Sequence, residues 1–269
     1  MATEAQDPQA VEDDAGPLEQ TAPVADESPD AASSTAEEAV QQPSEEALLA
    51  EFAHFRNLIK EGNYDAADVS AKRIVEMAIR IHGPQSLETS KALSNLGLVQ
   101  QNNKQYDASI QNFTSAIEIL EIVEDRLNAQ LVNPLMGLGA AQLGSGRPDL
   151  AAMTFGRATH ITHVNEGPHN VDQIEILESL AEANVRLGDI ETARDMLDRI
   201  HSLNVRHFEN DALGLLPSLL RRADWQHRAG YYNDERATYR RTIRIIETSA
   251  GKNDPRLVAP LARLPPWPR

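Results

Sequence analysis

The amino-acid sequence repeats itself every 42 residues over most of its length. One series holds residues that favour turns, at Gly62, Lys104, Gly146, Gly188 and Gly230. Further series of leucines, small residues and amides keep the same register: Leu93, Leu135, Leu177 and Leu219; Gly97, Gly139, Ala181 and Ala223; Gln100, Gln142, Asn184 and Gln226. Because these independent positions hold one spacing without an insertion, the sequence predicts a tandem array of structural units.

Each unit is interpreted as a pair of helices joined by a turn. In EEALLAEFAHFRNLIK, large apolar residues recur at intervals of three or four, which is the pattern of an amphipathic helix. The stretch GNYDAAD, residues 62–68, follows, and Gly62 and Asn63 should end that helix. We expect Asp65 to cap the second helix and Tyr64 to pack between the two helices.

The prediction for the whole chain is all-α. Five helical hairpins of about 42 residues should occupy residues 46–249. Residues 250–269 should hold the start of an incomplete sixth unit and a proline-rich end, since proline cannot continue a helix. Residues 1–45 are rich in Ala, Pro, Ser and acidic residues and lack large apolar side chains, which predicts a disordered acidic tail.

The charge of the chain limits the partners that it can attract. The formal net charge is −16, but residues 1–46 carry 13 of the 41 acidic residues and no Lys or Arg, so the rest is nearly balanced. Without a basic block, we expect no binding to nucleic acid. No apolar run is long enough to span a membrane. As written the chain should be cytoplasmic, and it could be periplasmic or exported if an upstream signal is missing.

The repeated unit resembles a known family. The recurring elements, clearest in LSNLGLVQQNNKQYDASIQNFTSAI at residues 93–117, resemble the tetratricopeptide repeat. The spacing of 42 residues is similar to the longer variant in kinesin light chains and many bacterial proteins. This resemblance implies a right-handed superhelical solenoid and a non-catalytic scaffold. It also implies that a peptide or a partner helix binds in a concave groove, which the first helix of each hairpin lines.

Four positions depart from the family pattern. Lys104 replaces the turn glycine of the second unit, and Pro148 replaces the turn aromatic of the third. Arg222 and Glu235 occupy normally apolar or small positions of the fifth unit. We therefore expect the fifth unit either to pack loosely or to rely on a neighbour that is absent from this sequence.

Register with the family pattern gives the candidate groove residues. They are Arg56 and Lys60 in the first unit; Lys91, Asn95, Leu98 and Asn102 in the second; Asn133, Met136 and Ala140 in the third; Glu175, Glu178, Glu182 and Arg186 in the fourth; and Arg221, Asp224 and Arg228 in the fifth. Asn95 and Lys91 could hold a peptide backbone or a carboxylate. Arg221 and Arg228 could pair with acidic ligand groups. The groove should be basic at its ends and acidic in the fourth unit, although ordinary surface polarity would give the same residues.

Catalytic and metal-binding patterns are weak in this sequence. The chain has no cysteine, no phosphate-binding loop and no nucleophile elbow, so we expect no enzyme activity, no catalytic residue and no cofactor. His160, His163, Glu166 and His169 form the densest set of metal-ligand types, but their spacing matches no familiar zinc pattern.

Three functions therefore stay open. The first is a scaffold that binds a protein or peptide in the groove. The second is an assembly module whose open C-terminal end docks on another subunit. A remote third is a metal-binding protein that uses the histidine set.

Overall fold

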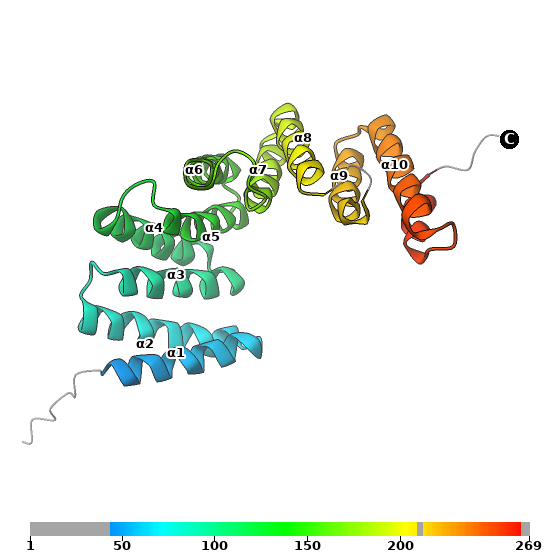
Figure 1. The fold of residues 1–269 in the computed structure, drawn as a ribbon. Coiled ribbons are helices and arrows are strands. Elements are labelled where there is room, and N and C mark those ends of the chain that lie inside the picture. Colours follow the sequence, from blue (N-terminus) through cyan, green and yellow to red (C-terminus); the bar gives the residue numbers. More distant parts are fainter. Residues whose placement is uncertain (1–43, 209–211, 265–269) are drawn as a thin grey trace, which may run out of the picture. The chain divides into compact units, whose positions relative to one another are not determined.

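The computed structural model describes residues 44–208 and 212–264, and this part of the chain is built from helices without strands (Figure 1). The helices are α1 (Glu45–Lys60), α2 (Tyr64–His82), α3 (Leu87–Asn102), α4 (Tyr106–Val123), α5 (Val132–Gly144), α6 (Pro148–Glu166), α7 (Gln173–Leu187), α8 (Ile190–His207), α9 (Leu216–Arg228), α10 (Tyr232–Ala250) and α11 (Val258–Arg263). Short 3₁₀ turns precede three of them: η1 (Ala129–Leu131), η2 (Leu213–Leu215) and η3 (Pro255–Leu257).

Consecutive helices pack in pairs, as the repeat predicted. Helices α1 and α2 form the first hairpin, and the pairs α3–α4, α5–α6, α7–α8 and α9–α10 follow. Each pair also packs against the next, so that the described chain is a solenoid of helical hairpins. The disordered tail that we predict lies almost entirely outside the described residues, and so does the end of the proline-rich segment.

The turns inside the hairpins all use the left-handed backbone conformation. The φ angles are +71° at Gly62, +59° at Lys104, +77° at Gly146, +82° at Gly188 and +79° at Gly230. Glycine reaches this region without strain because it has no Cβ, which explains why glycine recurs at this position. Lys104 is the one non-glycine residue with positive φ among the described residues.

The first turn corrects one prediction about capping. Asp65 does not cap α2; the cap is Asn63, whose side-chain oxygen accepts a hydrogen bond from the amide of Ala66 at 3.3 Å. Tyr64 is the first residue of α2, and it is half-buried against the core of the first hairpin. An amide side chain directly before a helix satisfies an amide that has no partner within the helix, and Asp65 lies too far along to do so.

A second capping series, which the sequence analysis missed, follows the same 42-residue spacing. Ser44, Ser86, Asn128, Asn170 and Asp254 each accept a hydrogen bond from a backbone amide two or three residues later. These side chains start the first helix, or the turn before it, in five units. The apolar Ala212 holds the same position in the fifth hairpin, where no side-chain cap forms.

The amide series of the repeat holds the two helices together in three of the hairpins. Gln100 accepts a hydrogen bond from Asn112 at 2.7 Å, and Gln142 accepts one from Thr154 at 2.8 Å. Gln226 accepts one from Thr238 at 2.8 Å. All three amides are buried, so these bonds satisfy polar groups that would otherwise destabilise the core.

Large side chains on the second helices fill the space within and between hairpins. The ring of Phe113 lies against Gly97 and Gly137, and the ring of Phe155 lies against Gly139, where an added Cβ would meet the ring at 2.5 Å. The absence of side chains at these glycines lets the helices approach.

The two departures in the fifth hairpin have partners, although α9 contacts α8 less extensively than the corresponding helices of earlier hairpins contact each other. Arg222 pairs with Asp198 on α8 at 2.6 Å, and the buried Glu235 pairs with His227 at 3.2 Å. The same hairpin also has its own apolar core, which Leu257 of η3 helps to complete. The fourth hairpin therefore supplies the partner of Arg222, and the fifth hairpin itself supplies the partner of Glu235.

Helix α11 occupies the position of the first helix of a sixth unit. Leu261 corresponds by the repeat to Leu135, Leu177 and Leu219, which are each at most 2% exposed. Leu261 is 52% exposed, and Val258 is 70% exposed. Helix α11 therefore exposes two apolar side chains, and earlier units bury the equivalent of Leu261. Within residues 44–208 and 212–264, no helix combines the length and apolar character that a membrane span requires.

Candidate partner-binding groove

Three adjoining cavities lie along the first helices of the second to fifth hairpins. We call them the amide cavity, between α3, α5 and α7, the acidic cavity, at the start of α5 and α7, and the tryptophan cavity, between α7 and α9. Their volumes are about 480, 620 and 490 Å³. The amide and acidic cavities share Asn133, Met136 and Glu175, and the acidic and tryptophan cavities share Glu178. Because neighbouring cavities share walls, they form one groove.

The amide cavity combines apolar walls with neutral polar groups. Leu98, Phe113 and Met136 supply apolar surface, and Asn95 and Gln101 supply amides. The Oε1 atom of Gln101 is buried and has no hydrogen-bond partner within the described residues. Amides can both donate and accept hydrogen bonds, so this cavity can recognise a peptide backbone.

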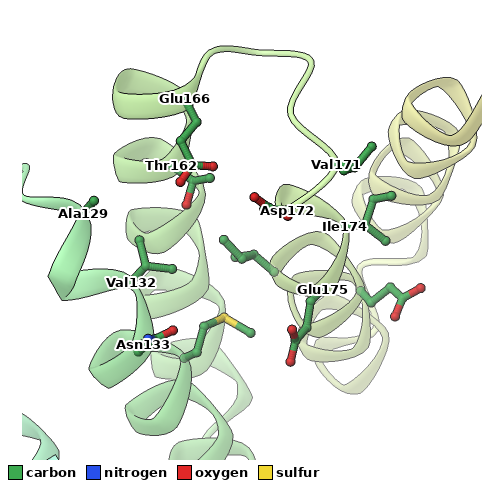
Figure 2. Close-up of a pocket in the computed structure, with 12 residues that line it drawn as sticks. Ala129, Val132, Asn133, Thr162, Glu166, Val171, Asp172, Ile174 and Glu175 are labelled. Atoms are coloured by element: carbon green, nitrogen blue, oxygen red, sulfur yellow. The ribbon is translucent and has the colours of Figure 1, made fainter. Parts of the chain in front are cut away.

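The acidic cavity is lined by carboxylates without a basic residue among its walls (Figure 2). Glu166 extends from the end of α6, and Asp172 and Glu175 lie at the start of α7 on the opposite side. Glu166 accepts a hydrogen bond from Asn170, while Asp172 and Glu175 make no ion pair with any described residue. Val132 belongs to the apolar part of the wall. The cavity therefore favours a positively charged group above an apolar surface.

The tryptophan cavity has an apolar floor and a rim of paired charges. Ala181, Leu197, Leu220 and Trp225 line the floor. Trp225 is 5% exposed, and its Nε1–H has no acceptor within the described residues. A buried donor without a partner costs free energy, about 1–3 kcal/mol.

The rim of the tryptophan cavity changes the charge pattern that we expected. Arg221 on α9 pairs with Glu178 on α7 at 2.6 Å. Arg228 pairs with Glu182 at 3.4 Å and with Asp224 at 3.2 Å. The arginines therefore neutralise the acidic residues of the preceding hairpin and do not form a separate basic end.

The structure brings together eight of the thirteen charged or amide residues that register selected. The three cavities are lined by Asn95, Asn133, Glu175, Glu178, Glu182, Arg221, Asp224 and Arg228, together with the apolar candidates Leu98, Met136 and Ala140. The other five line none of them: Arg56, Lys60, Lys91, Asn102 and Arg186. Arg186 instead pairs with Glu182 at 2.9 Å, and Asn102 donates to the carbonyl of Leu98.

Sequence reasoning missed several wall residues, chiefly Gln101, Glu166, Asp172 and Trp225. The sequence could have indicated Trp225, because the repeat places this large aromatic residue at the position that Ala141 and Ala183 hold in the third and fourth units. A large aromatic in a small-residue series indicates a local change in packing.

The histidine set does not form a metal site. His160, His163 and His169 are exposed, and no three residues of metal-ligand type converge anywhere in the described ranges. The structure therefore gives no support to the metal-binding alternative.

A separate polar cluster joins α8, α9 and α10. Arg241 on α10 lies with its Nη1 atom 2.9 Å from Nε2 of His201 on α8, and Arg222 and Asp198 lie nearby. The pKa of His201 is lowered to about 4, chiefly by burial and in addition by the positive charges of Arg222 and Arg241, while Asp198 opposes the shift. His201 is therefore neutral near pH 7 and accepts the hydrogen bond from Arg241.

These features define an α-solenoid of the helical-hairpin repeat class with a groove along its first helices. Residues 56–122 match the family model of the tetratricopeptide repeat. This segment therefore resembles tetratricopeptide repeats in sequence, and the helical-hairpin fold continues on both sides of it. A comparison with curated proteins found no match.

Solved structures with the same fold have low sequence identity to this chain. A kinesin light chain of Podospora anserina with nearly identical TPR-like repeats has a TM-score of 0.68 at 13% identity, covering 76% of this chain and 97% of its own. BtubC (BKLC) of P. vanneervenii has a TM-score of 0.64 at 14% identity, covering 78% and 83%. A Rap protein complexed with Competence and Sporulation Factor has a TM-score of 0.56 at 14% identity, covering 78% and 61%.

Proposed function

We propose that this chain is a non-catalytic scaffold that binds a peptide or a helix of a partner protein in the groove. The observation that carries the proposal is that the three cavities adjoin one another. The amide and acidic cavities share Asn133, Met136 and Glu175, and the acidic and tryptophan cavities share Glu178. A groove that crosses four first helices matches an extended segment better than a small molecule. The Rap protein with its bound factor provides a precedent for ligand binding by this fold.

The proposal is tested by photo-crosslinking from defined positions. A photoreactive phenylalanine analogue replaces Leu98 or Leu220, which line the groove and are 46% and 38% exposed. Matched controls carry the same analogue at Val69 or Met153, which are exposed on second helices and line none of the three cavities. We expect partner adducts from the groove positions, and adducts from the control positions alone would refute the proposal.

A second candidate function, assembly, rests on α11. Val258 and Leu261 expose apolar surface, and the equivalents of Leu261 in earlier units are buried. We propose that the same face of α11 in a second copy covers this surface, because burial of such side chains stabilises association by about 25 cal/mol per Å² of apolar area. The measurement that checks this proposal is the mass of the protein in solution as its concentration is changed.

A further inference from the structure

We propose that the groove selects a partner segment in which a lysine or arginine lies between apolar side chains. This inference rests on the proposed groove function and adds the chemistry of the ligand. The first support is the charge of the walls. Six carboxylates and two guanidinium groups line the three cavities: Glu166, Asp172, Glu175, Glu178, Glu182 and Asp224, with Arg221 and Arg228.

The two arginines are already engaged by the protein itself. Arg221 contacts Glu178 at 2.6 Å, and Arg228 contacts Glu182 and Asp224. An acidic ligand would have to displace these carboxylates, which would leave them beside one another without a cation. A basic ligand meets no such obstacle, because the remaining carboxylates are not paired with a cation of the described chain.

The carboxylates of the groove that have no ion pair within the described residues lie in the acidic cavity. Asp172 and Glu175 lie at the start of α7, and Glu166 faces them from α6 (Figure 2). Val132 and Ile174 belong to the same walls and can cover the methylene groups of a long basic side chain. The acidic cavity therefore offers both carboxylates for the charged end of a lysine or arginine and apolar surface for its methylene groups.

The two flanking cavities have a different character. Leu98 and Phe113 give the amide cavity apolar walls, and Leu197, Leu220 and Trp225 do the same for the tryptophan cavity. Apolar residues of an extended segment therefore suit both cavities.

The experiment selects peptides from a random display library on the full chain. We expect enrichment of peptides with a lysine or arginine flanked by apolar residues. A double variant, Asp172→Asn with Glu175→Gln, should bind the selected peptides about fivefold more weakly at low salt, since each exposed charge pair contributes modestly. A matched control, Glu76→Gln with Glu118→Gln, removes two exposed carboxylates on α2 and α4 and should leave affinity unchanged.

Each other outcome has a distinct meaning. Enrichment of acidic or uncharged peptides whose binding fails in Leu98→Lys or Leu220→Lys variants would overturn the inference and leave the groove function in place. Equal losses in the test and control variants would also overturn it. Failure to select any peptide above an uncoated surface, or selected peptides indifferent to both groove leucines, would overturn the proposed function itself.

Discussion

At the scale of single residues, glycines decide how closely neighbouring helices approach. Gly137 on α5 faces Phe113 on α4, and a Cβ added at Gly137 would overlap the phenylalanine ring. Gly156 lies inside α6 with nothing within 4 Å of the position of an added Cβ. The same substitution at these two glycines should therefore have opposite effects.

We predict that Gly137→Ala lowers the free energy of unfolding by about 1–3 kcal/mol, because overpacking forces the ring or the helix to move. Gly156→Ala should raise it by about 0.5–1 kcal/mol, because alanine favours a helix more than glycine does. Urea denaturation of both variants beside the wild type measures the two shifts. A stabilised Gly137→Ala protein would show that the α4–α5 contact is looser than the structure indicates.

At the scale of elements, the cluster between α8, α9 and α10 should make stability depend on pH. The folded-state pKa of His201 is lowered to about 4, compared with about 6.5 for an ordinary histidine. The unfolded chain therefore binds a proton that the folded chain does not over this window. The contribution of His201 to stability is complete above about pH 6.5 and is lost as the pH falls toward 4.

We predict that acidification from pH 7 to pH 4.5 costs the wild type about 1 kcal/mol more than it costs a His201→Gln variant. This value is well below the full linkage energy because His201 is only partly buried, so that water screens part of the interaction. Urea denaturation at a series of pH values measures the difference. His54→Gln, which replaces an exposed histidine on α1, is the control. Identical pH profiles for wild type and His201→Gln would contradict the role of the cluster.

The sequence predicted the elements well wherever the repeat itself specifies them. The turn glycine recurs in four of five units and the leucine in the second to fifth units, so a spacing of 42 residues reveals both series. The cap at Asn63 was wrongly given to Asp65, because both residue types favour helix starts and only the backbone decides between them.

At the scale of the whole molecule, the groove was predicted less completely than the fold. Its charges depend on contacts between units, such as Arg221 with Glu178 and Arg228 with Glu182. A repeat describes what the units have in common, whereas these pairs join residues that differ from one unit to the next. Register found the arginines and the glutamates but could not show that they neutralise each other.

Assembly through α11 is also a property of the whole molecule. We predict that the solution mass rises above that of the monomer as concentration increases, and that Leu261→Lys suppresses the rise by placing a charge on the exposed apolar face. Leu49→Lys is the matched control, since Leu49 is 66% exposed on α1. Light scattering across a dilution series checks this, and a constant monomer mass in the wild type would exclude self-association.

The regular spacing of turns and caps has a consequence for the gene that encodes this chain. The left-handed turns and the capping side chains each recur at intervals of 42 residues. Recombination that adds or removes 42 codons would join equivalent points of two hairpins, so that the junction keeps a native turn, a native cap and complementary helix faces. A change that is not a multiple of 42 codons would move the turn glycine away from the position where the backbone is left-handed. Array length can therefore vary by whole units while the groove gains or loses one set of wall residues at a time.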